Sequence, residues 1–390
     1  MTREAFALYI HVPFCSRKCP YCDFNTYATL EIPEEDYAQA LLAELDRYAQ
    51  DSDFSGRVIS SIFWGGGTPS LLSPNAIRRV LDRARDNFGI ARGAEVTLEA
   101  NPSQPSKERY AAFCDAGINR VSFGVQSFDQ DRLDLLGRDH TAQNACDSVA
   151  SCVDAGIGNV SVDIIFGVAN QTVEDLERDL SVAANLPITH LSTYALTIEP
   201  GTPFYQRQER GLLKAPTDDV VAAMLRGIPE YLAPHGFERY EISNYARKDL
   251  KSAHNEAYWI GRDYLGIGAG AHSYLAKYEG ARRIGASRWS TLALPASFMR
   301  AAGTNGTISW REDLGAESIH FEFFYLGLRR TCGVSLTEFE DLFGFSPRSR
   351  YGDVVSQLES EGFITDTGSG IALTKEGIAL ADSVYERFLL

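Results

Sequence analysis

Short apolar runs rich in β-branched residues alternate with helical patterns along the first 245 residues, and this alternation restricts the fold more than any other feature. Six of the runs have the length of buried strands, and most of the segments between them are long enough for helices. Strands joined by right-handed crossovers form a parallel sheet that can curl into part of a barrel. The expected strands are residues 6–12, 59–64, 95–99, 120–125, 160–166 and 190–196.

Two of the intervening segments show the helical pattern clearly. Pro33 suits a first turn, and Leu41 and Leu45 recur on one face of the segment that follows it. Residues 141–156 form a second pattern, which ends at a glycine suited to a C-terminal cap. We therefore predict an α/β protein with a partial (β/α)6 TIM-like barrel. In such barrels the chemistry lies at the C-terminal ends of the strands.

Three cysteines, Cys15, Cys19 and Cys22, follow the first expected strand in one loop with C-x3-C-x2-C spacing. Three thiolates within eight residues can hold three irons of a [4Fe-4S] cluster and leave the fourth iron free for a substrate or cofactor. The alternative is a zinc site with His11 as fourth ligand, although zinc ligands usually come in two separated pairs. The remaining cysteines lie among apolar neighbours and suit a core: Cys114, Cys146, Cys152 and Cys332.

Glycines and carboxylates mark the ends of the following strands. Residues 65–69, Gly-Gly-Gly-Thr-Pro, form a turn in which the missing β-carbons let a ligand approach the backbone. Glu99 ends the third strand and can accept hydrogen bonds from two ribose hydroxyls. Asp163 lies in an apolar run of the fifth strand, where a charge is costly unless it is paired or faces a ligand. The sequence thus predicts a polar ligand site at this edge of the sheet.

The cysteine spacing resembles that of the radical S-adenosylmethionine (SAM) superfamily, whose members chelate SAM at the open iron. Further motifs narrow the resemblance, over essentially the whole chain, to the family of oxygen-independent coproporphyrinogen III oxidase (HemN) and the heme chaperone HemW. These motifs are Tyr9-Ile-His-Val-Pro-Phe-Cys15, Gly65-Gly-Gly-Thr-Pro69, Glu99-Ala-Asn-Pro102, Gly124-Val-Gln-Ser-Phe128, Arg138 and Asp163-Ile-Ile-Phe-Gly167. Applied residue by residue, the resemblance implies SAM contacts at Tyr9, Tyr21, Gly66, Gly67, Thr68, Glu99, Gln126, Arg138 and Asp163, with Thr197 as a further candidate.

Three features resemble the chaperone branch of the family rather than the oxidase branch. Phe24 occupies the position of a further cysteine in the oxidase pattern, and only fourteen residues precede Cys15. The segment His254-Asn-Glu-Ala-Tyr-Trp259 is similar to an H-N-x-x-Y-W motif of the chaperones. The resemblance therefore implies a heme chaperone that binds a [4Fe-4S] cluster, SAM and heme and delivers heme to acceptor hemoproteins. The alternative is the oxidase, which decarboxylates porphyrinogen propionates with a SAM-derived radical.

The residue types of this last motif also suit a heme region formed by His254, Asn255, Tyr258 and Trp259. An imidazole can ligate heme iron, flat aromatic rings can stack on a macrocycle, and nearby Lys and Arg can pair with propionates. The alternative is structural: His254 and Asn255 brace the lower rim of the barrel while Tyr258 and Trp259 fill a core.

Charge is distributed unevenly along the chain. The net charge is −15, yet residues 247–311 carry ten Lys and Arg against four acids. Such a basic segment suits an anionic ligand or partner, with a solvated basic face as the alternative. The overall negative charge argues against nucleic acid as a partner.

The patterns predict three parts: a barrel over residues 1–245, a basic connecting region over 246–310, and a winged-helix-like domain over 311–390. In the last part we expect helices at 316–330, 335–343 and 351–361, then strands at 363–366 and 370–374. Its acidic composition points to a lid or partner surface rather than a phosphate contact. Unpaired cysteines and the absence of a leader-like segment predict a cytoplasmic location. A homodimer and transient contact with a membrane surface stay open.

Overall fold

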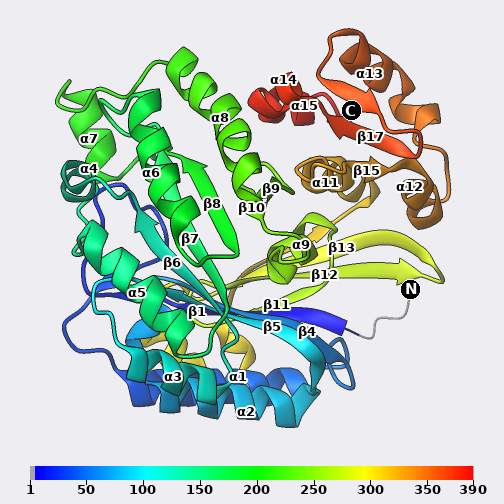
Figure 1. The fold of residues 1–390 in the computed structure, drawn as a ribbon. Helices are drawn as coiled ribbons and strands as arrows, with labels where there is room; N and C mark the ends of the chain where they lie inside the picture. Colours follow the sequence, from blue (N-terminus) through cyan, green and yellow to red (C-terminus); the bar gives the residue numbers. More distant parts are fainter. Residues whose placement is uncertain (1–4, 390) are drawn as a thin grey trace.

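One twelve-stranded sheet runs through the structure, a computed structural model that describes residues 5–389 (Figure 1). Its seven central strands are parallel, in the order β11-β1-β4-β5-β6-β7-β8. Six of them correspond to the six expected strands, so the partial barrel is confirmed. The parallel strands are β1 (Ala5–Val12), β4 (Val58–Gly66), β5 (Ile90–Ala100), β6 (Arg120–Gln126), β7 (Asn159–Phe166), β8 (His190–Ala195) and β11 (Tyr264–Ile267).

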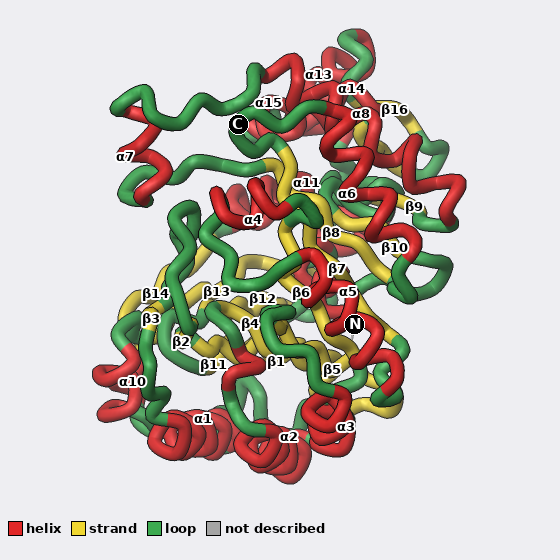
Figure 2. The backbone as a smooth tube through the Cα atoms, turned by 60° about the vertical axis from the view of Figure 1, so that its left-hand side comes forward, coloured by secondary structure: helices red, strands yellow, loops and turns green. Residues whose placement is uncertain are grey.

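Helices connect the parallel strands, and α1, α2 and α3 lie in a row along one side of the sheet (Figures 1 and 2). Local signals set their ends: Ser73 caps α2, and Thr141 and Asn144 form a capping box that starts α5. The helices of this part are α1 (Glu34–Ala49), α2 (Pro74–Phe88), α3 (Lys107–Ala116), α4 (Gln130–Leu135), α5 (Ala142–Asp154), α6 (Val173–Asn185), α7 (Pro203–Glu209) and α8 (Asp218–Leu232). Short 3-10 turns cover Pro69–Leu71, Ala233–His235 and Asn305–Thr307.

The segment 246–310, expected to be a connecting region, also adds strands to the sheet. Strand β11 pairs with β1 in parallel, and β12, β13 and β14 continue outward as antiparallel neighbours. At the opposite edge, β10 and β9 follow β8. These elements are β9 (Glu238–Arg239), β10 (Asn244–Ala246), α9 (Ala253–Trp259), β12 (His272–Glu279), β13 (Arg282–Thr291), α10 (Pro295–Ala301) and β14 (Ile308–Leu314).

Part of the positive charge of this segment is paired or buried. Arg288 forms ion pairs with Glu312 and Glu322, and Lys277 pairs with Asp313. Arg283 is only 7% exposed. Other basic residues of the segment, such as Lys248, Lys251 and Arg262, are exposed.

The C-terminal residues form a smaller unit that packs against β12 and β13 (Figure 1). The predicted three helices and two strands are present, and the structure adds a third strand and two short helices. The core of this unit includes Phe324, Phe339 and Tyr351, and it extends to Tyr274 on β12. The elements are α11 (Ala316–Gly327), β15 (Val334–Ser335), α12 (Leu336–Phe343), α13 (Arg348–Ser360), β16 (Ile364–Asp366), β17 (Gly370–Leu373), α14 (Lys375–Ala379) and α15 (Ala381–Glu386).

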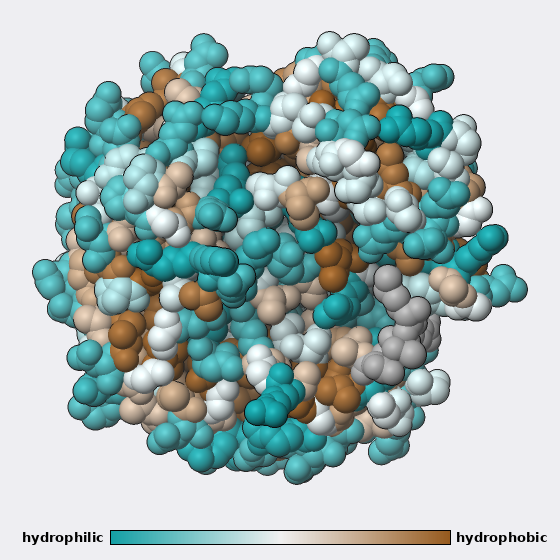
Figure 3. Space-filling view, turned by 45° about the vertical axis from the view of Figure 1, so that its right-hand side comes forward, coloured by the Kyte–Doolittle hydropathy of each residue, from teal (hydrophilic) through white to brown (hydrophobic). Residues whose placement is uncertain are grey.

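The surface view shows hydrophobic residues in small patches among hydrophilic ones (Figure 3). In the part of the chain that is described, no helix has both the length and the apolar character needed to span a membrane.

Candidate functional site

The C-terminal ends of the parallel strands and the cysteine loop enclose a cavity of about 570 Å³, called here the strand-end cavity. All three loop cysteines line it, and so does Thr197. Of the nine residues expected to contact SAM, eight also line it: Tyr21, Gly66, Gly67, Thr68, Glu99, Gln126, Arg138 and Asp163. Tyr9 does not line this cavity. Its hydroxyl lies 3.0 Å from Nδ1 of His11, and its ring packs on Phe63.

The cysteine loop is held between two short parallel strands, β2 (Phe14–Cys15) and β3 (Tyr27–Ala28). Each of the three thiols has a polar neighbour. Thr68 Oγ1 donates to Cys15 Sγ at 3.7 Å, and Arg138 Nη1 donates to Cys19 Sγ at 3.4 Å. Cys22 Sγ lies 3.8 Å from Thr26 Oγ1. Burial raises the pKa of the Cys15 thiol, whereas the hydrogen bond from Thr68 opposes this shift.

The glycine turn packs directly beneath the cysteine loop. A β-carbon at Gly67 would lie 2.6 Å from the carbonyl oxygen of Phe14 and 3.0 Å from Cys15 Sγ. Gly66 has φ of 112°, a left-handed conformation that favours glycine. Its backbone N–H donates to Glu99 Oε2 at 3.0 Å. The turn therefore brings backbone, carboxylate and thiols together, which requires glycine at both positions.

Two carboxyl groups face the cavity from neighbouring regions of the sheet. Burial and then the charge of Asp163 raise the pKa of Glu99 to about 8, against the opposing effects of the Gly66 N–H and Arg120. Burial also raises the pKa of Asp163, although Ser122 Oγ donates to it at 3.2 Å. Such a pair is stabilised by hydroxyl donors or by a positively charged ligand. The cavity floor thus suits a cationic ligand that carries hydroxyl groups.

Arg138 connects several parts of the strand-end cavity. Its guanidinium donates to the carbonyl oxygen of Gly124 at 2.7 Å and to the side-chain oxygen of Asn101. Asn101 in turn donates to Asp139 at 2.6 Å. Sequence reasoning missed Asn101 as a site residue, although it lies within the motif at residues 99–102. It also missed Tyr194, which lines the cavity at the end of β8 and for which the sequence carries no clear signal.

The donors present suit an iron–sulfur cluster better than a zinc ion. His11, the fourth ligand in the zinc alternative, uses both ring nitrogens: Nδ1 faces Tyr9 and Nε2 lies 3.0 Å from the carbonyl oxygen of Asn25. Within residues 5–389, no three His, Cys, Asp or Glu side chains come together around a single ion position. Three thiols that line the same cavity match a cluster of several irons.

The H-N-x-x-Y-W segment lies elsewhere, at α9. His254 is 1% exposed, its Nδ1 lies 3.0 Å from Ser61 Oγ, and its Nε2 lies 3.0 Å from the Tyr258 hydroxyl. Burial, with a smaller effect of Arg120, lowers the pKa of His254 to about 3. Both ring nitrogens are therefore occupied in this structure. Asn255 is partly buried on the same helix, and Tyr258 and Trp259 line a second cavity.

A strand-end cavity in a partial barrel, with three cysteines directly after the first strand, defines a radical SAM protein. The Radical SAM superfamily profile matches residues 9–183, and the HemN C-terminal domain profile matches residues 316–380. Coproporphyrinogen III oxidase (HemN) from Escherichia coli, a radical SAM enzyme, has a similar fold. It superimposes with a TM-score of 0.81 over 99% of this chain and 90% of the oxidase, at 22% identity.

Sequence similarity is higher to proteins of one branch. The heme chaperone HemW of Lactococcus lactis is 34% identical over 390 residues, which cover 100% of this chain and 99% of that protein. HemW of Escherichia coli K12 is 36% identical over 390 residues, which cover 98% of each chain. The chain belongs to the HemW family within the radical SAM superfamily.

Proposed function

We propose that this protein is a heme chaperone that binds a [4Fe-4S] cluster through Cys15, Cys19 and Cys22. SAM binds beside the cluster in the strand-end cavity, and heme is held as cargo and delivered to acceptor hemoproteins. The observation that carries the proposal is the full-length identity of about one third to proteins named heme chaperone HemW. The oxidase, by contrast, shares the fold at 22% identity.

The chain's own residues would orient SAM in the cavity. Glu99 would accept hydrogen bonds from ribose hydroxyls, and Gly66 and Gly67 would expose backbone groups to the methionine part. Asp163 and Arg138 would complete the polar lining around it. A bound cluster of this type supplies an electron for reductive cleavage of SAM. Delivery of heme does not require that turnover, so in the chaperone the cluster and SAM would serve structure or regulation.

Phe24 supports the choice of chaperone over oxidase. It stands where the oxidase pattern has a further cysteine, is 65% exposed, and lies at the wall of the strand-end cavity. A phenyl ring has no donor atom, so Phe24 cannot ligate iron or hydrogen-bond to a second polar cofactor as a cysteine at this position could.

The deciding experiment is anaerobic and uses protein loaded with its cluster. We expect hemin to bind with micromolar or tighter affinity, about −8 kcal/mol or better, measured through the absorption spectrum of the porphyrin. Coproporphyrinogen III with SAM and a strong reductant should give no vinyl products. Decarboxylation over many turnovers by the unmodified protein would replace the chaperone assignment with the oxidase.

The cluster assignment has a separate test. Cys15→Ala, Cys19→Ala and Cys22→Ala should each abolish cluster assembly, since three thiolates are the smallest set that leaves one iron open. Cys114→Ala serves as the matched control and should keep full iron and sulfide content. Measurement of iron and acid-labile sulfide after anaerobic purification checks this. Stoichiometric zinc without sulfide in the unmodified protein would contradict the cluster.

A further inference from the structure

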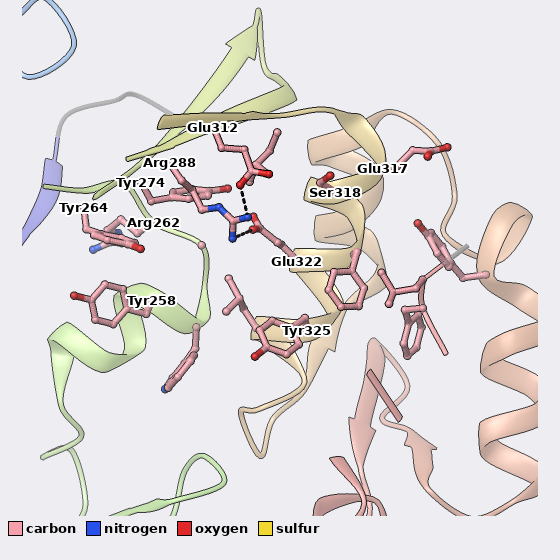
Figure 4. A pocket seen from close by; sticks show the side chains of 18 of the residues that line it. Tyr258, Arg262, Tyr264, Tyr274, Arg288, Glu312, Glu317, Ser318, Glu322 and Tyr325 are labelled. Atoms are coloured by element: carbon pink, nitrogen blue, oxygen red, sulfur yellow. Dashed lines mark hydrogen bonds and ion pairs between the residues drawn. The ribbon is translucent and has the colours of Figure 1, made fainter. Parts of the chain in front are cut away.

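A second cavity, of about 670 Å³, lies between α9, the strands β12 to β14 and helix α11 of the C-terminal unit (Figure 4). We call it the interdomain cavity. It shares no lining residue with the strand-end cavity. Its volume falls within the range of roughly 300–1,000 Å³ that is usual for cavities that enclose small molecules or cofactors. The structure therefore contains two separate spaces of cofactor size.

Flat aromatic side chains form much of the wall of the interdomain cavity. They come from both sides, the barrel sheet with α9 and the C-terminal unit, so they can face a ligand from opposite directions (Figure 4). Aromatic rings favour stacked or edge contacts with other π-systems. The aromatic lining residues are Tyr258, Trp259, Tyr264, Tyr274, Phe321, Tyr325, Tyr351 and Phe388.

Two polar groups in this wall lack a partner. Tyr274 and Arg288 are directly opposite each other on β12 and β13, so their side chains share one face of the sheet. Tyr274 is 4% exposed, and neither its hydroxyl nor the buried Nε of Arg288 has a hydrogen-bond partner within residues 5–389. A buried donor without a partner destabilises the protein until an acceptor binds to it. Both donors are buried inside the wall, so an acceptor such as a carboxylate reaches them only when the two side chains turn toward the cavity.

Charge around the cavity is balanced before a ligand enters. Arg288 Nη2 lies 2.8 Å from Glu312, and Nη1 lies 3.1 Å from Glu322 (Figure 4). Arg350 pairs with Glu317 across the C-terminal side. Arg262 is exposed at the edge and has no ion pair within the part of the chain that the structure describes. A carboxylate ligand would thus bind at Arg262 on the edge, and a second carboxylate would bind at Tyr274 and Arg288 Nε once these side chains turn toward the cavity.

We propose that the interdomain cavity is the place where this protein holds an iron porphyrin. The macrocycle lies between the aromatic walls, and its carboxylate side chains bind Tyr274, Arg288 and Arg262. This inference rests on the proposed function, which supplies heme as the cargo. The cavity itself supplies the match to a flat aromatic ligand with carboxylates. His254 contributes by holding the Tyr258 ring in the wall and not by ligating the iron.

Hemin titration of the full chain, loaded with its cluster, tests the location. Ser318 lies at the edge of the cavity on α11, so Ser318→Trp should obstruct it and weaken hemin binding at least tenfold. Tyr274→Phe and Arg288→Met should each weaken binding about threefold to thirtyfold through loss of a carboxylate contact. Ser360→Trp on α13 and Arg348→Met, both outside the two cavities, are the matched controls and should bind as the unmodified protein does. Unchanged SAM binding shows that the barrel is intact in each variant, and unchanged thermal unfolding shows the same for the C-terminal unit.

The results of these titrations distinguish failure of the proposed heme site from failure of the proposed chaperone function. Normal hemin binding in Ser318→Trp and Tyr274→Phe would overturn the interdomain cavity as the site and leave the chaperone function standing. No hemin binding by the unmodified protein would overturn both. The dimethyl ester of hemin tests the carboxylates: we expect weaker binding that does not respond to Arg288→Met. Equal affinities of hemin and its ester would overturn the role given to Tyr274 and Arg288.

Discussion

Glu99 lies at the end of β5 with its carboxyl group facing the strand-end cavity, and its ionisation depends on what the cavity holds. With a pKa raised to about 8, the folded protein keeps this proton at pH values where an unfolded chain has released it. The folded state therefore loses stability, relative to the unfolded chain, as the pH rises from about 4.5 to about 8. A cationic ligand that restores the charged carboxylate offsets this loss.

Glu99→Gln removes the titrating group but keeps its size. Without ligand, the variant should therefore become more stable than the unmodified protein as the pH rises from 5 to 8, by a difference on the order of 1–3 kcal/mol. At the same time its affinity for SAM should fall, because an amide is a weaker acceptor for ribose hydroxyls. Urea unfolding at both pH values and calorimetry with SAM measure the two effects. Exposed Glu108→Gln is the control, and an equal gain at pH 5 and pH 8 would contradict the argument.

Residues that line the strand-end cavity were predictable from sequence to the extent that motifs mark strand ends. The cysteines and the glycine turn are recognisable because their spacing is local and their chemistry is unusual. Tyr9 shows the limit: β1 is largely buried on both faces, so sequence alternation cannot say whether a side chain reaches the cavity or packs on Phe63. The environment of His254 could not be predicted from sequence either. One of its partners, Ser61, lies on the distant strand β4, and the other, Tyr258, lies on its own helix.

Among the elements, α9 depends on a contact across the barrel. Glu95 on β5 is 9% exposed, and its carboxylate accepts from Ser252 Oγ at 3.2 Å and from the backbone N–H groups of Ala253 and His254 at 3.1 and 3.2 Å. A carboxylate in this place satisfies the free donors at the start of a short helix. Glu95 thus fixes α9 to the interior of the sheet.

Glu95→Ala should therefore destabilise the protein by about 2–4 kcal/mol, since it leaves buried donors without an acceptor. It should also speed hydrogen exchange in residues 253–259 more than in α2 or α5. Denaturant unfolding and exchange mass spectrometry measure these effects. Glu108→Ala is the control: it removes an exposed carboxylate at the start of α3 and measures how much stability is lost without a buried contact. A loss below about 1 kcal/mol with unchanged exchange in α9 would show that Glu95 does not anchor the helix.

Most helices and strands were predictable from sequence where the apolar residues follow a single helical or strand pattern. The parallel strands are continuous apolar runs because both faces of the sheet are covered, and the capped helices carry their own start signals. Strands β12 to β14 were not expected, since the segment is rich in Lys and Arg. Some of those charges are β13 side chains, among them Arg283, which is buried, and Arg288, which pairs with Glu312 and Glu322. A pairing partner distant in sequence cannot be read from local composition.

At the scale of the whole molecule, a packed cluster of rings connects the interior of the barrel with the wall of the interdomain cavity. The Tyr9 ring centroid is 6.4 Å from that of His254, which is 4.9 Å from that of Tyr258. Phe63 stacks on His254 at 5.1 Å. The strand-end cavity belongs to the barrel alone, whereas the interdomain cavity needs both the sheet extension and α11. The C-terminal unit therefore forms part of the wall of the interdomain cavity and shares a core with β12 and β13.

This arrangement predicts two distinct footprints in hydrogen exchange. Hemin should slow exchange in α11 (Ala316–Gly327) and in β12 and β13, because a ligand in the interdomain cavity joins these elements. SAM should slow exchange in the cysteine loop and in residues 66–68, which line only the strand-end cavity. Helix α3 lines neither cavity and is the internal control. Exchange mass spectrometry with each ligand alone measures both footprints, and protection of the cysteine loop by hemin with α11 unchanged would place the porphyrin in the barrel instead.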